Sequence, residues 1–307
     1  MQNERLGKTI IDALTLCYVA EGKVLDHLRE VKHQYSIDTF TLHRTSGKHH
    51  KEHFDIYLHN KKVATIYFDR FGSSGDEFYV WLRIENHVLY NHQLLIQTLM
   101  LPELLDIDFN NITYIELARD FTYNITQRIR SLMRNPELKT IINGKQKKDR
   151  DEAIDGIIRT CKISLNKDLP KSLCIKQAKA EKNKYDGITM DSYNKMDEIT
   201  SKSHKQYILD YYGYPKKLHR LELRLNNADI KKISKAIGLS VTDDTIFNQD
   251  ALDHIYLQAL QSLLRFTDGR KKLDWQMLFD CNLRYRYQHP LPLHLFSSYL
   301  ADNKKIK

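Results

Sequence analysis

The chain has 307 residues, of which 41% are hydrophobic and 28% are charged, and its formal net charge at pH 7 is +9. A chain of this length can bury the core of one large domain or two. No run approaches the ~20 consecutive apolar residues that span a bilayer, and the polar N-terminus lacks the apolar core of a signal peptide. The sequence therefore predicts a soluble, globular, cytoplasmic protein without membrane contact.

The first part of the chain predicts strands and helices in alternation. Period-two alternation of apolar residues indicates strands, whereas apolar residues three and four positions apart indicate helices. In chain order we expect a strand at Ile10–Tyr18, a helix at Gly22–Lys32, a hairpin of Phe54–Leu58 and Val63–Phe68, a strand at Glu77–Glu85, a helix at Leu89–Leu105 and a strand at Ile112–Phe121. This order predicts an α+β fold with a central antiparallel β-sheet and flanking helices.

The strand expected at Ile112–Phe121 carries two carboxylates among apolar residues. Glu116 and Asp120 are four residues apart, so both side chains point to the same face of a strand. Burying two like charges is unfavourable, and proteins compensate for it with a bound divalent cation or with an Arg or Lys partner. Since oxygen ligands suit Mg²⁺ or Mn²⁺, one interpretation is a metal site of this kind. The alternative is an ordinary charged sheet face that arginines neutralise.

Positive charge is concentrated in the middle of the chain. From Arg128 to Lys184 there are 16 Lys and Arg against 7 Asp and Glu, an excess equal to the net charge of the whole chain. Such a block is either a solvated loop or a phosphate-binding surface. Because it lies between two acidic strands, a polyanion attracted to it would arrive near the expected metal site. Nucleic acid is therefore the favoured partner, and the candidate DNA contacts are Lys145, Lys147 and Lys148.

Tyr193 is followed by Asn194, Lys195 and, further on, Glu198. A phenol with a pKa near ~10 attacks poorly at neutral pH unless a metal polarises the electrophile and a cation stabilises the phenolate. Tyr193 is thus a candidate nucleophile, with Lys195 as its cation, on condition that a metal site lies nearby. The alternative is that Tyr193, one of 18 tyrosines, serves packing or hydrogen bonding.

A second charged strand is expected at His219–Leu225, where charged residues alternate with leucine. The period of two puts Arg220, Glu222 and Arg224 on one face. Glu222 can therefore join Glu116 and Asp120 at the metal site.

The C-terminal region from residue 234 to 307 predicts a mainly helical segment, separate from a catalytic domain at residues 1–233. Asn248 or Asp250 can cap a helix with an apolar stripe from Leu252 to Leu264, which Thr267–Gly269 would end. Further on, Arg284 and Arg286 alternate with tyrosines. They are either solvated or in contact with DNA, since Arg pairs with phosphates and Tyr stacks on bases.

Taken together, the ordered motifs resemble the trans-acting replication initiation factors of small rolling-circle plasmids, a family related to the relaxase-like proteins of conjugative elements. The resemblance runs from residue 11 to residue 223 and rests on Ile11–Thr15, Arg83–Glu85, Glu116 with Asp120, Tyr193–Lys195 with Glu198, and Arg220–Leu223. In this family the motif that Tyr193 matches provides the nucleophile that nicks DNA.

The resemblance implies an enzyme that nicks and rejoins origin DNA through Tyr193, with a divalent metal at Glu116, Asp120 and Glu222. It leaves a 5′-phosphotyrosine link and a free 3′-hydroxyl. It also implies a homodimer, and a host helicase is a candidate partner that the sequence does not identify. A relaxase that nicks a transfer origin uses the same chemistry and is not separable from it by sequence. A non-catalytic DNA-binding regulator is the alternative from another class, and there Arg119, Arg220 and Arg224 would neutralise the acids.

Several other site types are disfavoured by the sequence. None of the 14 histidines forms the His-x-His triplet of the other large class of nicking proteins. The chain has no Gly-x-x-x-x-Gly-Lys-Ser/Thr or Gly-x-Gly-x-x-Gly segment, so no nucleotide cofactor is expected. The scattered Cys17, Cys161, Cys174 and Cys281 lack ligand spacing, which predicts reduced thiols without zinc or a disulfide framework.

Overall fold

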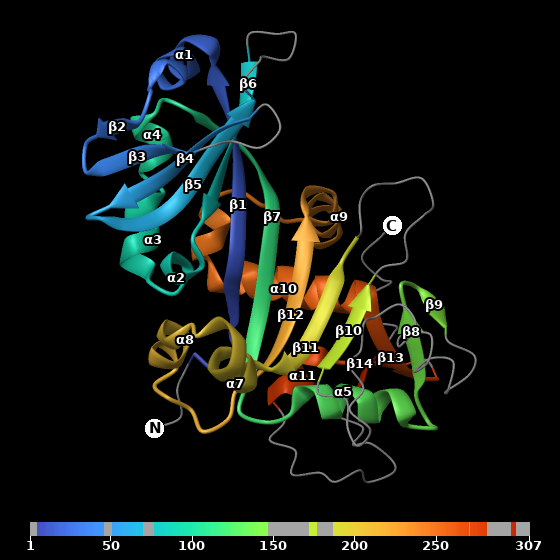
Figure 1. Cartoon of the computed structure of the whole chain (residues 1–307). Helices are drawn as coiled ribbons and strands as arrows, with labels where there is room; N and C mark the ends of the chain where they lie inside the picture. Colours follow the sequence, from blue (N-terminus) through green and yellow to red (C-terminus); the bar gives the residue numbers. More distant parts are fainter. Residues whose placement is uncertain are drawn as a thin grey trace.

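The computed structural model describes residues 5–45, 51–69, 77–146, 172–176, 187–269, 271–280 and 296–298. Within these ranges, a large sheet of ten strands forms the centre of the molecule (Figure 1). None of the described helices is long and apolar enough to cross a membrane.

The large sheet is antiparallel throughout, in the order β10-β11-β12-β7-β1-β6-β5-β4-β3-β2. Its strands are β1 (Thr9–Glu21), β2 (Gln34–Ile37), β3 (Phe40–Thr45), β4 (Lys51–Leu58), β5 (Lys61–Asp69), β6 (Glu77–Ile84), β7 (Asp108–Phe121), β10 (Ser172–Lys176), β11 (Thr189–Asn194) and β12 (His219–Asn226). The long strands β1 and β7 run side by side through the middle and join the two halves of the sheet (Figure 1). The predicted antiparallel sheet of an α+β fold is therefore present.

Alternation along the strands gives the sheet two different faces. Leu16, Phe54, Val80 and Leu82 belong to the main hydrophobic core, and helices α3 (His92–Thr98), α4 (Leu101–Leu104) and α10 (Gln249–Leu263) lie behind the sheet in Figure 1. The opposite face carries polar and aromatic side chains that are partly exposed. Because period two sends successive residues to opposite faces, the functional side chains described below share this second face.

Most elements expected in the first part of the chain are confirmed, including helix α1 (Gly22–Glu30) and the β4–β5 hairpin. The single helix predicted at Leu89–Leu105 is wrong. Three short helices occupy the region, namely α2 (Asn86–Leu89), α3 and α4. The Asn91 side chain accepts a hydrogen bond from the Leu94 backbone N–H and starts a new helix. Pro102, which has no N–H, sits in the first turn of α4, where that donor is not needed.

The C-terminal region combines helices with strands. Helices α9 (Asn227–Ile237), α10 and α11 (Trp275–Asp280) are present, and Asn248 caps α10 as expected. However, α10 ends at Leu263, and the chain continues as a strand. This strand belongs to a second sheet of the described residues, ordered β15-β14-β13-β8-β9. Its members are β8 (Lys139–Ile142), β9 (Lys145–Gln146), β13 (Leu264–Asp268), β14 (Lys271–Leu273) and β15 (Phe296–Ser298).

Two features explain why β13 is a strand and not the last turn of α10. Leu264 and Phe266 are buried, and β13 pairs with β8, so tertiary contacts decide the conformation. The pairing also joins β8, which precedes most of the basic block, to the C-terminal region. The described residues therefore do not clearly show a mainly helical C-terminal region, because strands β13, β14 and β15 accompany its helices.

Candidate metal and tyrosine site

Three adjacent strands bring three carboxylates together on the polar face of the large sheet. Asp12 comes from β1, Glu116 from β7 and Glu222 from β12, and one oxygen of each lies within 4.8 Å of the others. β7 lies between β1 and β12 in the sheet. Two of these residues, Glu116 and Glu222, are predicted site residues.

A β-bulge places Asp12 in this group. Ile11 pairs with Leu117 and Ala13 pairs with Glu116, so Asp12 is an extra residue on β1 without a counterpart on β7. A bulge of this kind interrupts the period of two and redirects a side chain. The sequence signal for Asp12 was present, because an aspartate lies within an apolar strand and opens the first family-like motif. A strict period of two along the strand does not predict the direction in which the Asp12 side chain points.

Asp120, the third predicted metal ligand, lies apart from the other two. It shares their face of the sheet, but four residues of strand separate it from Glu116 by about 13 Å. Asp120 instead accepts hydrogen bonds from its cross-strand partner Arg220, from Nε at 2.8 Å and from Nη2 at 2.6 Å. Both side chains are completely buried. Among the described residues, the group of carboxylates that could share one ion is therefore Asp12, Glu116 and Glu222, without Asp120.

Arg220 joins the ion pair of Asp120 to the carboxylate trio. Its Nη1 lies 2.7 Å from Asp12 Oδ1, and its Nη2 donates a hydrogen bond to the Tyr90 hydroxyl at 2.8 Å. Tyr90 in turn donates to Asp12. Burial opposes ionisation of Asp12, but Arg220 and Lys195 outweigh it and hold the pKa of this carboxyl well below its ordinary value. Asp12 is therefore an ionised carboxylate at neutral pH.

Glu222 lies in a different electrostatic environment. Burial and the neighbouring Glu116 raise the pKa of Glu222 above its ordinary value of 4.5, although Arg220 opposes the shift. Arg224 offers partial compensation, since its guanidinium lies 3.0 Å from Glu222 Oε1, 3.2 Å from Glu116 Oε1 and 3.1 Å from Asp191 Oδ2. Its side chain is 41% exposed, so this cation is in contact with solvent.

The charges of the described site residues do not balance. Three cations form ion pairs here, namely Lys195, Arg220 and Arg224. They are surrounded by six carboxylates, namely Asp12, Glu116, Asp120, Asp191, Glu198 and Glu222. Mg²⁺ prefers oxygen ligands at about 2.0–2.1 Å, so ligands on opposite sides of the ion are about 4 Å apart. The trio is close to that spacing, and its residues fit a divalent cation such as Mg²⁺ or Mn²⁺.

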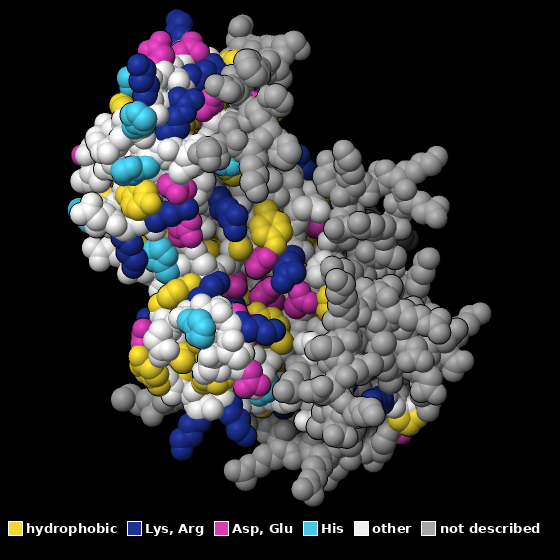
Figure 2. Space-filling model, viewed as in Figure 1, with side chains coloured by type: hydrophobic (Ala, Val, Ile, Leu, Met, Phe, Trp, Pro, Cys, Tyr) yellow, Lys and Arg dark blue, Asp and Glu magenta, His cyan; other side chains and the backbone are white. Residues whose placement is uncertain are grey.

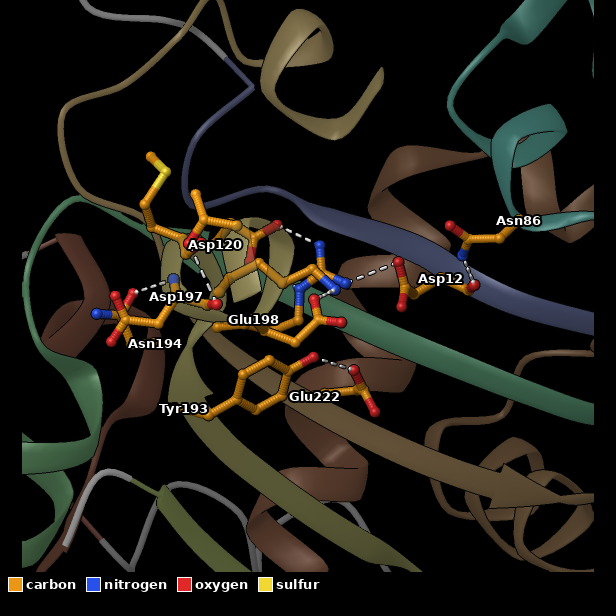
Figure 3. Close-up of polar contacts among 12 residues, drawn as sticks. Asp12, Asn86, Asp120, Tyr193, Asn194, Asp197, Glu198 and Glu222 are labelled. Atoms are coloured by element: carbon orange, nitrogen blue, oxygen red, sulfur yellow. Dashed lines mark hydrogen bonds and ion pairs between the residues drawn. The ribbon is translucent and has the colours of Figure 1, made fainter. Parts of the chain in front are cut away.

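Tyr193 points at the carboxylate trio from the neighbouring strand β11 (Figure 3). Its hydroxyl donates a hydrogen bond to Glu222 Oε2 at 3.0 Å, and its cross-strand partner is Arg220. Burial raises the pKa of the Tyr193 hydroxyl well above its ordinary value, and Glu222 adds to this rise while Arg220 opposes it. The phenol is therefore protonated at neutral pH when no metal ion is bound.

The residues after Tyr193 begin helix α7 (Lys195–Glu198). The Asn194 side chain accepts a hydrogen bond from the Asp197 backbone N–H, at 3.3 Å, and so caps this helix (Figure 3). Lys195 is buried, and its Nζ lies 2.8 Å from Glu198 Oε2 and 5.7 Å from the centre of the Tyr193 ring. Burial and Arg220 lower the pKa of Lys195, whereas Asp12 and Glu198 oppose this shift. The Lys195 ammonium thus lies near the Tyr193 ring and beside the Glu198 carboxylate.

A cleft of about 650 Å³ opens beside Asp12 and Glu116. Its lining includes Tyr67, Arg83 and Lys205. Figure 2 shows Asp and Glu side chains gathered in the hollow at the centre of the molecule, with Lys and Arg side chains around them.

The predicted DNA contacts are not tested by the structure. Lys145 belongs to β9, while Lys147, Lys148, Arg284 and Arg286 lie outside the described residues. Comparisons of the chain with models of known protein families, with curated protein sequences and with solved structures found no match.

Proposed function

We propose that this protein nicks and rejoins origin DNA to initiate rolling-circle replication, with Tyr193 as the nucleophile. The observation that carries the proposal is the hydrogen bond from the Tyr193 hydroxyl to Glu222, one of three carboxylates that converge from adjacent strands. A tyrosine, an adjacent proton acceptor and a set of metal ligands are the groups that a phosphodiester transesterification needs. The ordered motifs of the sequence support the same chemistry.

In the proposed reaction the Tyr193 oxygen attacks the scissile phosphorus. The bond between this oxygen and phosphorus forms as the bond to the 3′-oxygen breaks, and the leaving 3′-oxygen takes a proton from water. Glu222, whose Oε2 accepts the hydrogen bond of the Tyr193 hydroxyl, is placed to accept the phenol proton. The products are a 5′-phosphotyrosine link and a 3′-hydroxyl, and the reverse reaction rejoins the strand.

A divalent ion held by Asp12, Glu116 and Glu222 would polarise the phosphate and stabilise the charge that develops on it. Arg220 has a positioning role in this account. It fixes Asp12 through Nη1 and is itself held by Asp120. Lys195 lies against the Tyr193 ring and would favour the ionised phenol during attack.

The same chemistry serves a relaxase, which nicks a transfer origin to mobilise DNA. DNA is the proposed partner in both cases, and a homodimer and a host helicase are proposed with it.

A second candidate function is a DNA-binding regulator without catalysis. Arg220 contacts Asp12 and Asp120, and Arg224 contacts Glu116 and Glu222, which favours a structural role for the acids. Arg119, by contrast, pairs with Asp253 and does not neutralise them. The charge imbalance around the trio favours the enzyme over the regulator.

Nicking of supercoiled plasmid separates these functions. The plasmid should carry the DNA that flanks this reading frame, and the assay should compare Mg²⁺, Mn²⁺ and a chelator. The enzyme gives metal-dependent open circles with protein attached to the 5′ end. Sequence-specific binding without open circles under any of these conditions would mean that the protein is a regulator.

A further inference from the structure

A row of stacked aromatic rings lies on the same face of the sheet as the carboxylate trio. His53 and Tyr67 stack at 5.5 Å between ring centres with an angle of 16° between their planes. Tyr67 and Trp81 stack at 5.5 Å and 14°, and Tyr79 adjoins Trp81 at 6.3 Å. These four residues come from β4, β5 and β6 and form what we name the aromatic row.

Strand register connects the aromatic row to the candidate site. Trp81 pairs with Cys17 on β1, and two residues along the strands Arg83 pairs with Thr15, which also pairs with Tyr114 on β7. Tyr114 donates a hydrogen bond to Glu116. Since cross-strand partners share a face, the row and the trio form one continuous surface. Asp12 is five residues from Cys17, so the row ends about 15 Å from the carboxylates.

The surface between the row and the trio has the charge that a polyanion needs. Arg83 is exposed and, among the residues that the structure describes, forms no ion pair. Arg83, Lys205 and Tyr67 line the cleft that opens beside Asp12 and Glu116. Side chains of this part of the sheet, aromatic and basic, lie above the acidic hollow in Figure 2.

Partly exposed aromatic rings on a sheet face bind unpaired bases by stacking, whatever the base, and neighbouring cations hold the phosphates. A duplex keeps its bases stacked inside and cannot use such rings. We propose that the aromatic row is the binding subsite for the single-stranded DNA that flanks the scissile phosphate, with Arg83 and Lys205 on its backbone. A few nucleotides of an extended strand cover the distance from Trp81 to the trio. This subsite rests on the proposed function for the identity of the strand.

Binding of a fluorescent oligothymidylate of about 12 nucleotides tests the subsite, since single-strand sites cover about 4–16 nucleotides. The full chain is used with a chelator, so that no cleavage occurs. We expect Trp81→Ala and Tyr67→Ala each to weaken binding about tenfold, because stacking of one base contributes that much. Trp81→Phe, which keeps a ring, should lose much less. The matched control is Tyr57→Ala, which removes a tyrosine that contacts His43 outside the row.

Two further ligands separate stacking from charge. An abasic strand of equal length has the phosphates but no bases, and it should bind the parent and Trp81→Ala equally. Duplex DNA should also bind both equally. Arg83→Gln should lower the salt slope of oligothymidylate binding by about 0.7, the value for one phosphate contact on a single strand.

Tryptophan fluorescence covers the case in which an alanine variant does not fold. The chain has two tryptophans, and Trp275 is buried in the C-terminal region. Oligothymidylate should quench the parent, and Trp81→Phe should abolish the quenching. Quenching that persists in Trp81→Phe, or unchanged binding by folded Trp81→Ala and Tyr67→Ala, would overturn the subsite.

This test is independent of nicking. Weaker binding by the row variants, together with a parent that never forms a covalent link, would keep the subsite and reject the nicking enzyme. Covalent linkage through Tyr193 together with unchanged oligothymidylate binding by the row variants would keep the nicking enzyme and reject the subsite.

Discussion

The Tyr193 hydroxyl and Glu222 Oε2 are 3.0 Å apart across the neighbouring strands β11 and β12. This contact couples a phenol to a buried carboxylate whose pKa is raised. It also joins Tyr193 to the trio that Glu222 forms with Asp12 and Glu116. The candidate nucleophile, proton acceptor and metal ligands are therefore one connected unit, in which Glu222 is both the proton acceptor and a metal ligand.

Asp12 and Asp120 should have different roles, although Arg220 contacts both. We expect Asp12→Asn to weaken Mn²⁺ binding at least about tenfold, since it removes a charged ligand of the trio. Asp120→Asn should leave more of the Mn²⁺ affinity and lower the free energy of unfolding by about 3–5 kcal/mol, because it leaves Arg220 buried without its main partner. Titration calorimetry and denaturant unfolding measure the two effects. Loss of Mn²⁺ binding in Asp120→Asn alone would contradict Asp12, Glu116 and Glu222 as the ligand set.

Glu222 should make the metal-free protein less stable as pH rises. Burial and Glu116 raise its pKa above 4.5 in the folded protein. The folded protein therefore keeps a proton that the unfolded chain has lost, and the free energy of unfolding falls as pH increases through this range. Glu222→Gln removes this loss, so the stability of the variant relative to the parent should grow as pH rises above 4.5, the ordinary pKa of the carboxyl.

Denaturant unfolding with a chelator measures the Glu222 effect. Saturating Mn²⁺ should stabilise the parent more than Glu222→Gln, because the ion binds the ionised form. Parallel pH profiles of the two metal-free proteins would show that Glu222 titrates as in the unfolded chain.

Lys195 should act on the rate and not on DNA affinity. It is buried against the Tyr193 ring, so Lys195→Gln removes a charge near the developing phenolate. We expect a fall in the cleavage rate of roughly 100-fold, the size found for one stabilising group. Lys202→Gln removes an equal charge from an exposed position of the same region and is the matched control. Single-turnover nicking compares them, and equal rates would leave Lys195 without a catalytic role.

The basic block should contribute to affinity for every DNA sequence. Replacing Lys145, Lys147 and Lys148 together with Gln should weaken binding to origin and scrambled duplex alike. The salt dependence should flatten by roughly one unit of log–log slope for each lysine that pairs with a phosphate in the parent. An unchanged slope of the salt dependence would mean that the basic block is a solvated loop. Selective loss of origin binding would mean that the block reads sequence.

The alternation of side chains between the two faces of a strand was sufficient to predict part of the site. It put Glu116 on one face of one strand and Glu222 on one face of another, and the structure pairs these two strands and brings both carboxylates together. It failed for Asp12 because a bulge redirects that side chain. Period two also put Asp120 on this face, but Asp120 is not part of the trio, because its carboxylate pairs with the buried Arg220.

In the fold too, local sequence patterns predict some elements, whereas contacts between distant segments decide others. The β4–β5 hairpin follows from local alternation. β13 does not, because its pairing with β8 joins segments more than a hundred residues apart. The aromatic row was missed for a similar reason, since its rings come from three strands and only the register brings them together.

Covalent capture of DNA tests the central claim most directly. The parent, Tyr193→Phe and the control Tyr211→Phe are incubated with single-stranded origin DNA and Mn²⁺, and denaturing gels and peptide mass spectrometry locate any linked nucleotide. We predict a 5′-phosphotyrosine on the Tyr193 peptide of the parent and of Tyr211→Phe, and none in Tyr193→Phe, which should still bind duplex DNA because it loses only one hydroxyl. A covalent link that persists in Tyr193→Phe would contradict the account.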